Sequence, residues 1–217
     1  MRRATLTASA TAALFALAPT FGAESRASAA TFGASWQFNE TSGSAIDSTG
    51  NGNSGTKHGG VTRTGTGYDF DGSTGYVSVP DSSTLDPGSG NIALTIRFNV
   101  DPVPKGYDYD LVRKGLSTTV GGDYKAEVLF GGKGLCHFRG STNSATVTGG
   151  SGLETGTHTL KCVKTGSSVQ LLVDGSVKAS KTITVGSISN GSSVPLGAKP
   201  GDDFTNGFID FIQITTS

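Results

Sequence analysis

The stretch WQFNETSGSAIDSTGNGNSGTKHGG, residues Trp36–Gly60, decides the fold, because a short apolar strand runs here into a long turn of small polar residues. Six of these twenty-five residues are glycines, which adopt the positive φ angles that tight turns need. The side chains of Asp47, Asn51 and Asn53 can hydrogen-bond to the main chain beside them and close such turns. The stretch therefore predicts a β protein with an N-terminal strand and a long ordered loop.

The first thirty residues are typical of a secretory signal peptide. Two arginines precede an uncharged, Ala- and Leu-rich run over residues 4–23, and the small-residue pattern Ala27-Ser28-Ala29 follows it. No later stretch reaches the roughly 18 apolar residues that a membrane span requires. We therefore expect residues 1–29 to be a signal peptide, cleaved after Ala29 or Ala30, and residues 30–217 to form one secreted domain without a membrane span.

Charge and composition favour an all-β domain that does not bind nucleic acid. Without residues 1–29, the basic residues fall from 17 to 14 and the acidic residues from 17 to 16, which leaves a formal charge of −2. A near-neutral chain without a basic stripe argues against a nucleic-acid partner. Nearly all of the 33 glycines lie after residue 29, and no long helical period is present. Both features indicate many turns between short strands.

The residues Ile92–Val100, IALTIRFNV, alternate apolar and polar side chains along their whole length. This period of two is typical of an antiparallel strand with one buried face. Similar runs predict strands at Tyr76–Val79, Tyr109–Arg113, Tyr124–Phe130, Leu135–Arg139, Thr157–Lys164, Val169–Val173, Val177–Val185 and Phe208–Thr215. About ten short strands without helices predict an antiparallel β-sandwich or jelly roll.

Cys136 and Cys162 are the only cysteines in the chain. In an exported protein such a pair is expected to form a disulfide. Each cysteine shares a strand face with apolar neighbours, so we expect a bridge either between neighbouring strands or across the core. Two free buried thiols are the alternative.

Four pieces of sequence, in this order along the chain, resemble motifs of a known domain family. They are WQFNETSGSAIDSTGNGNSG (36–55), FDGSTGYVSVPDSSTLDP (70–87), VQLLVDG (169–175) and GFIDFIQI (207–214). Together they resemble the laminin G-like domains of the concanavalin A-like lectin/glucanase superfamily. The resemblance covers nearly all of residues 30–217 and implies a jelly roll of two antiparallel sheets. It does not imply one activity, because this fold carries lectins, adhesion modules, glycosidases and lyases.

The acidic residues argue against catalysis. Glycosidases of the family carry alternating acids along one strand, in a pattern like E-x-D-x-x-E, and hydrolysis needs two carboxyl groups. The strand that matches best has only Glu127, and Lys125 stands where a second acid would lie. The loop acids Asp110, Asp202 and Asp203 are the remaining candidates for a second carboxyl. We therefore expect that this protein is not an enzyme. The alternative is a glycan-active hydrolase or lyase of the same fold.

The resemblance also implies a structural calcium ion. Asp210 in GFIDFIQI matches the closing Asp of the family and interrupts an otherwise apolar strand. A buried carboxylate needs a compensating partner, and a hard cation with oxygen ligands would serve. Asp71 and main-chain carbonyl groups of residues 36–38 would supply the other ligands. The alternative is that Asp210 and Asp71 accept hydrogen bonds from nearby turns.

Two predicted loops carry the side chains that sugar binding requires. Tyr107 and Tyr109 lie in PVPKGYDYD, and Asp202 and Phe204 lie in PGDDFTNG. Aromatic rings can stack on a pyranose while acids bond its hydroxyl groups, and loops at the edge of a scaffold commonly carry function. These four residues are the candidate ligand-binding residues. The alternative is that Tyr109 begins a strand and turns inward, and that Phe204 plugs the end of the sandwich.

The sequence as a whole favours a secreted, non-catalytic module that binds a glycan or an extracellular surface. The enzyme alternative predicts product release from a polysaccharide. A third alternative, an extracellular protein-interaction module, predicts binding to a protein but to no glycan.

Overall fold

The computed structural model describes Met1, residues 31–199 and residues 201–217, so the predicted signal peptide beyond Met1 lies outside the described residues. The described residues form fifteen strands and one 3₁₀ helix. They are β1 (Thr31–Trp36), β2 (Thr56–His58), β3 (Val61–Arg63), β4 (Tyr68–Asp71), β5 (Tyr76–Val79), η1 (Ser83–Leu85), β6 (Ile92–Val100), β7 (Asp108–Lys114), β8 (Asp123–Leu129), β9 (Lys133–Arg139), β10 (Ser144–Gly149), β11 (His158–Thr165), β12 (Ser168–Val173), β13 (Ser176–Thr182), β14 (Val194–Leu196) and β15 (Asn206–Thr216). None of the helices described is long and apolar enough to cross a lipid bilayer.

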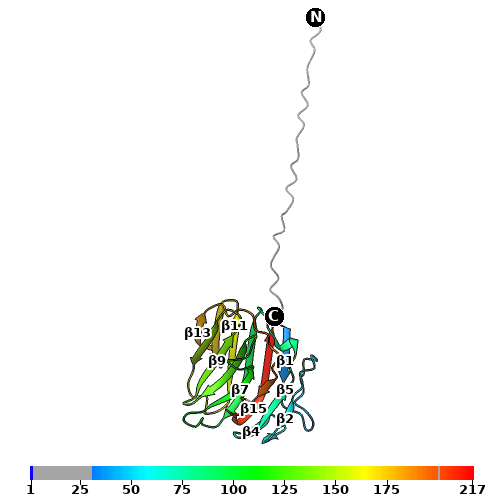
Figure 1. Ribbon diagram of the computed structural model, residues 1–217, viewed down its shortest axis with the longest axis vertical. Coiled ribbons are helices and arrows are strands. Elements are labelled where there is room, and N and C mark those ends of the chain that lie inside the picture. The colour runs from blue at the N-terminus through cyan, green and yellow to red at the C-terminus, as the bar shows by residue number, and fades with distance from the viewer. Residues whose placement is uncertain (2–30, 200) are drawn as a thin grey trace.

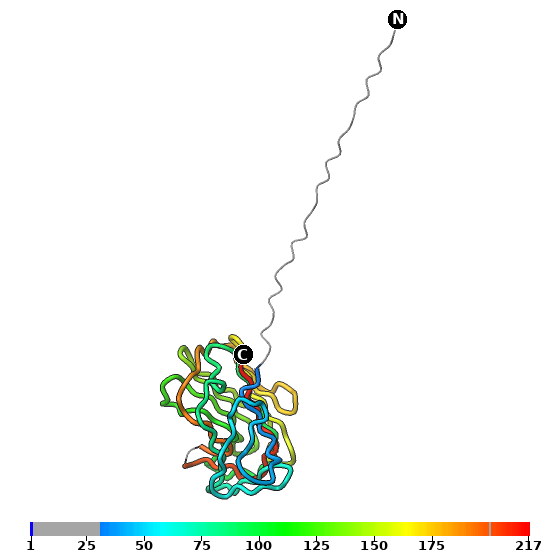
Figure 2. The backbone as a smooth tube through the Cα atoms, turned by 90° about the vertical axis from the view of Figure 1, so that its right-hand side faces the viewer, coloured from blue at the N-terminus to red at the C-terminus, as the bar shows by residue number. Residues whose placement is uncertain are grey.

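The strands form two antiparallel sheets packed as a sandwich (Figure 1), which confirms the predicted fold class. One sheet has the order β13-β12-β11-β6-β15-β4-β3, and the other has the order β10-β9-β8-β7-β14-β5-β2. Strand β15 pairs with β4 along its first half and with β1 along its second half. The first and last strands, blue and red in Figure 2, therefore lie side by side.

The alternating stretch Ile92–Val100 forms β6 as predicted. Leu94, Ile96 and Phe98 are fully buried in the core between the sheets. Strand β6 pairs with β11 on one side and with β15 on the other. Because its apolar face has period two, the strand can occupy this central position only with that face toward the opposite sheet.

The loop after β1 is ordered by its own polar side chains. The Asp47 carboxylate accepts hydrogen bonds from the main-chain N–H groups of Ser35 and Asn53, each at 3.0 Å. The fully buried Trp36 donates from its indole nitrogen to the carbonyl oxygen of Asn53 at 2.8 Å. The predicted strand and ordered loop are both present.

The disulfide between Cys136 and Cys162 joins the two sheets. Cys136 lies on β9 and Cys162 on β11, with their Cα atoms 5.4 Å apart. Of the two arrangements expected from the sequence, the structure has the bridge across the core.

Some strand boundaries differ from the prediction. Strands β2, β3, β4, β10 and β14 were not predicted, because four of them have only three or four residues each and β10 is the polar run SATVTG. The predicted strand over 177–185 ends at Thr182. Tyr109 and Asp110 lie within β7, which confirms the strand predicted over Tyr109–Arg113 and corrects the separate description of these two residues as loop residues.

Candidate ligand-binding site

A cavity of about 360 Å³ lies beside the start of β7. It is named the loop cavity here and is lined by Asp71, Gly72, Pro104, Tyr107, Asp108, Tyr109, Asp202, Asp203, Phe204 and Asn206. The structure thus brings together all four residues predicted to bind a ligand, although the two segments that carry them are about ninety residues apart in the sequence. One predicted metal ligand, Asp71, also lines this cavity.

The connection from β14 to β15 closes one side of the loop cavity, because it lies along β7. Gly197 donates its main-chain N–H to the carbonyl oxygen of Leu111 at 3.0 Å, and the N–H of Asp110 donates to the carbonyl oxygen of Asp203 at 3.2 Å. Thr205 donates its hydroxyl to the carbonyl oxygen of Asp110 at 3.1 Å. These bonds fix Phe204 and its neighbours opposite the segment that carries Tyr107.

Lys199 forms ion pairs within the connection between β14 and β15. Lys199 Nζ donates to Asp202 Oδ2 at 2.9 Å and to Asp203 Oδ2 at 2.7 Å. The hydrogen bonds to Asp203 and Asp202 raise the pKa of Lys199, and the bond from Lys199 lowers the pKa of Asp202. Both acids line the loop cavity and present their carboxyl oxygens there.

The aromatic residues of the loop cavity have different roles. Tyr107 is 61% exposed, and Phe204 is partly exposed, so both rings can meet a ligand. Tyr109 is only 4% exposed, and its hydroxyl donates to the carbonyl oxygen of Pro102 at 3.4 Å. Tyr109 therefore lies near the start of a strand and turns inward, as the alternative expected. Its ring forms part of the cavity wall that lies next to the core.

A second cavity, of about 520 Å³, lies over β7 to β10 and is named the sheet cavity here. It is lined by Asp108, Arg113, Leu116, Ser117, Thr118, Asp123, Lys125, Leu135, His137, Thr146, Lys199 and Asp203. Asp108 and Asp203 line both cavities, so the two adjoin at these acids.

Cross-strand pairing arranges the polar face of the sheet cavity. Arg113, Lys125, His137 and Thr146 lie opposite one another on β7, β8, β9 and β10 in turn. His137 Nδ1 is 2.7 Å from Thr146 Oγ1, and its Nε2 is 3.2 Å from Asp123 Oδ1. Each of these side chains that can carry a positive charge already has an acid or hydroxyl partner.

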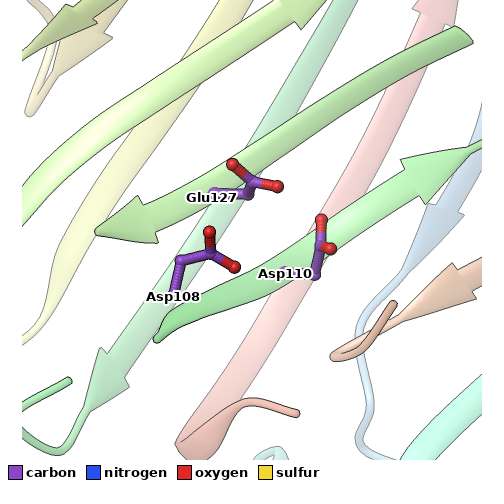
Figure 3. Close-up of side chains that lie close together, drawn as sticks. All are labelled: Asp108, Asp110 and Glu127. Carbon is purple, nitrogen blue, oxygen red and sulfur yellow. The ribbon is translucent and has the colours of Figure 1, made fainter. Parts of the chain in front are cut away.

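Three carboxyl groups converge on the paired strands β7 and β8 (Figure 3). The ligand oxygens of Asp108, Asp110 and Glu127 all lie within 4.8 Å of one another. Asp108 and Asp110 lie two residues apart on β7, and Glu127 pairs with Asp110 from β8. These three residues are named the acidic cluster.

A β-bulge at Leu111 places a cation beside the acidic cluster. Residues three apart point to opposite faces of a regular strand, but the register shift between Asp110 and Val112 puts Asp110 and Arg113 on the same face. Arg113 Nη2 donates to Asp110 Oδ2 at 2.7 Å and to Glu127 Oε1 at 3.1 Å. Lys125 Nζ also donates to Glu127 Oε1.

Burial and mutual repulsion favour the protonated form of two of these acids. Burial, followed by the charge of Glu127, raises the pKa of Asp108 to about 6. The same two causes, in the same order, raise the pKa of Asp110 to about 8, although Arg113 opposes the shift. Asp110 is 0% exposed and Glu127 is 1% exposed.

The two residues predicted to bind calcium have protein partners. Arg97 Nε donates to both carboxylate oxygens of Asp210, at 2.8 and 2.9 Å. Asp71 accepts five hydrogen bonds from Ser73, Thr74 and Gly75. Burial works against them, but these bonds lower the pKa of Asp71. Calcium at Asp71 and Asp210 stays a prediction, and neither residue belongs to the acidic cluster.

The sequence did not identify the acidic cluster. It treated Asp110 as a loop acid and Glu127 as the only acid on a strand facing a groove. The D-x-D spacing of residues 108 and 110 at the start of a predicted strand was the available signal. Its pairing with Glu127 depends on the register between β7 and β8, which the sequence does not reveal.

Comparison with known proteins gives a family and a fold. The family model of the concanavalin A-like lectin/glucanases superfamily matches residues 71–217. A comparison with curated proteins found no significant match.

Several solved structures share the fold. The binding domain of Paraclostridial Mosquitocidal Protein 1 superposes with a TM-score of 0.67 at 15% identity, covering 85% of this chain and 48% of that one. A structure titled for botulinum neurotoxin type C, whose cell entry depends on two ganglioside molecules, has a TM-score of 0.66 at 9% identity, covering 86% and 48%. This chain therefore spans about half the length of the toxin domains that it matches.

Another similar structure is closer to this chain in length. It is domain 4 of AbnA, an extracellular arabinanase of glycoside hydrolase family GH43 from Geobacillus stearothermophilus, in complex with arabinotriose. It superposes with a TM-score of 0.62 at 17% identity, and the match covers 87% of this chain and 93% of that domain. At these identities the likeness shows the fold.

Proposed function

Because the chain belongs to the concanavalin A-like lectin/glucanase superfamily, we propose that residues 30–217 form a secreted, non-catalytic module that binds carbohydrate in the loop cavity. One observation carries this function. The exposed ring of Tyr107 and the partly exposed ring of Phe204 line a single cavity together with the carboxylate of Asp202 and the amide of Asn206.

The size and lining of the loop cavity suit a sugar. Its volume of about 360 Å³ falls in the range of about 300–1,000 Å³ that is usual for small-molecule sites. A pyranose has apolar C–H faces that stack on aromatic rings and hydroxyl groups that bond carboxylates and amides. Tyr107 and Phe204 would supply the stacking, and Asp202 and Asn206 the hydrogen bonds.

The solved structures with this fold support the same class of ligand. The botulinum neurotoxin title names ganglioside molecules, and the arabinanase domain is in complex with arabinotriose. Both ligands are glycans, bound by proteins that share the sandwich with this chain.

Export is supported by two independent features. The chain begins with a sequence typical of a signal peptide, and its two cysteines are joined in a disulfide, which persists in oxidising compartments. N-terminal sequencing of protein recovered from the culture medium is expected to begin at Ala30 or Thr31. Protein retained in the cell with Met1 intact would contradict export.

A hydrolase is the second candidate function, and the acidic cluster is the observation that favours it. Retaining glycosidases hold two carboxyl groups about 5–5.5 Å apart, and Asp110 and Glu127 bring ligand oxygens within 4.8 Å of each other. However, both side chains are almost fully buried, and Arg113 bridges them. A glycosidic bond must reach between the two acids, so this burial supports the non-catalytic function.

The test of the proposed function combines binding and product release. The purified domain is incubated with a glycan array and with insoluble polysaccharides, and bound protein and released reducing ends are both measured. Glycan binding without release from laminarin, lichenan, xylan, agar or alginate is expected. Release by the wild type that is lost in Glu127→Gln would establish the hydrolase instead, and binding to a protein but to no glycan would establish a protein-interaction module.

Variants locate the binding surface. Tyr107→Ala and Phe204→Ala are each expected to weaken glycan binding at least about tenfold, because truncation of a central aromatic anchor costs more than about 1.4 kcal/mol. Phe130→Ala is the matched control, since Phe130 is an exposed aromatic residue that lines neither cavity. Equal affinity in all three variants would place the glycan elsewhere.

A further inference from the structure

We propose that the acidic cluster of Asp108, Asp110 and Glu127 is a binding site for one divalent cation with oxygen ligands, and that Ca²⁺ is its occupant. This site is distinct from the pair Asp71 and Asp210 that the sequence suggested. It also does not depend on glycan binding, because it rests on contacts within β7 and β8.

Unpartnered buried oxygens distinguish this cluster from ordinary neighbouring acids. Asp110 is fully buried, and its Oδ1 is a buried atom with no hydrogen-bond partner among the described residues. Asp108 Oδ1 is also buried and has no partner in the part of the chain that the structure describes. In Figure 3 the carboxyl groups of Asp108 and Asp110 both point toward that of Glu127. A buried carboxylate oxygen without a donor is costly, so the arrangement favours a group that such oxygens can bind.

The neighbouring cations occupy only part of each carboxylate. Arg113 donates to Asp110 through Oδ2 alone, from both its Nε and its Nη2. Both hydrogen bonds that the structure gives to the Glu127 side chain, from Arg113 and Lys125, end on Oε1. The oxygens that remain are the ones that a bound ion would contact.

Charge within the cluster is also uncompensated when all three of its acids are ionised. The three carboxylates of Asp108, Asp110 and Glu127 then face two contacting cations, Arg113 and Lys125. A bound cation would supply the positive charge that these side chains leave short and would favour the ionised acids.

The ligand types select the class of ion. The three cluster residues offer carboxylate oxygens and neither sulfur nor imidazole, which suits Ca²⁺, Mg²⁺ or Mn²⁺ rather than Zn²⁺. Ca²⁺ accepts six to eight oxygens in flexible geometry, whereas Mg²⁺ demands a near-ideal octahedron. Asp108 lines both cavities, so water can complete a calcium shell from that side.

Calorimetric titration of the chelator-treated domain with CaCl₂ tests the site, together with the melting temperature. We expect one Ca²⁺ per chain and a rise of about 5 °C in Tm at a concentration near 100 times Kd, since the ion binds only the folded state. Asp108→Asn is expected to weaken Ca²⁺ binding at least about tenfold. Asp210→Asn, the matched control, is expected to retain the wild-type affinity.

Two results would overturn the proposal. One is a wild type that shows neither heat nor a Tm shift at millimolar CaCl₂, and the other is binding that survives Asp108→Asn but is lost in Asp210→Asn. If Asp108→Asn does not fold, Mn²⁺ added to ¹⁵N-labelled wild type decides the matter. Broadening centred on the amides of residues 108, 110 and 127 supports the site, and broadening centred on residue 210 contradicts it.

Discussion

Two acidic regions of this protein differ in how completely the fold satisfies them. The carboxylates of Asp71 and Asp210 have donors on both oxygens, from a turn in one case and from Arg97 in the other. In the acidic cluster, Asp108 and Asp110 each keep a buried oxygen without a donor from residues 31–199 or 201–217. Acids whose oxygens all have donors stabilise the fold, whereas the acids with unpartnered buried oxygens lie at or beside the loop cavity, where we propose that a ligand binds.

The difference follows from where the acids lie. A turn supplies several free N–H groups within a few residues, so Asp71 collects five hydrogen bonds. Within a sheet the main-chain N–H groups are already used in the ladder, so an acid on a strand must find side chains. Arg113 is the cation that the bulge at Leu111 brings to Asp110.

The largest effect is expected for Arg113→Met. This change leaves Asp110 and Glu127 buried without their shared cation, and breaking a buried ion pair from one side costs about 3–5 kcal/mol. Urea denaturation of the chelator-treated domain at about pH 9, above the raised pKa of Asp110, measures the loss. A cost below about 1 kcal/mol would mean that the acids are neutral, or that water reaches them freely.

A smaller loss is expected for Asp71→Ala. The turn after β4 loses five hydrogen bonds, but the residue is exposed and water replaces most of them. We expect a cost of about 1–2 kcal/mol in the same denaturation experiment. A cost as large as that of Arg113→Met would erase the distinction between the two regions.

The effect of Arg97→Met is expected to be smaller again. Its guanidinium contacts Asp210 at the surface, with the Arg97 side chain 54% exposed. Exposed ion pairs contribute about 0–1 kcal/mol, and less at high salt. Denaturation curves in low and high salt measure this contribution. A loss above about 2 kcal/mol in the free energy of unfolding would contradict this expectation. It would show that Asp210 depends on Arg97 as strongly as a buried acid depends on its cation.

The smallest effect is a pH dependence at a third pair, His158 and Asp174, whose Nδ1 and Oδ2 atoms are 2.8 Å apart. The hydrogen bond to Asp174 raises the pKa of His158, so its contribution is full below about pH 6.5 and is lost as pH rises through the raised pKa. Bonds from Thr159 and His158 lower the pKa of Asp174, so its contribution is lost as pH falls through that lowered value.

Melting of His158→Gln at two pH values checks this sign. The variant is expected to melt about 1 °C below the wild type at pH 5.5 and at the same temperature at pH 9. A larger difference at pH 9 than at pH 5.5 would contradict the assignment.

The sequence predicted the fold because its signals are local. The alternation of Ile92–Val100 and the glycine-rich loop after Trp36 each specify one element without reference to the rest of the chain. The disulfide was expected because the chain has two cysteines and export signals. Its place across the core depends on which sheet holds β9 and which holds β11, and that is a property of the topology.

The candidate site was only partly predictable, since its contacts are not local. The sequence predicted that Tyr107 and Phe204 lie in two separate loops. Only the hydrogen bonds between β7 and the connection before β15 bring these two loops together, so that both rings line one cavity. The acidic cluster depends on the register of β7 against β8 and on the bulge at Leu111. A single extra residue in one strand changes which side chains share a face, and composition does not reveal it.

The loop cavity is the place where we propose that the ligand binds. NMR titration of the ¹⁵N-labelled domain with an oligosaccharide from the glycan screen tests it most directly, because every described amide reports at once. We expect the largest shift changes at the amides of Tyr107, Asp108 and Phe204, with β13 unchanged. Shift changes centred on β13, or on the surface pair Arg97 and Asp210, would contradict it.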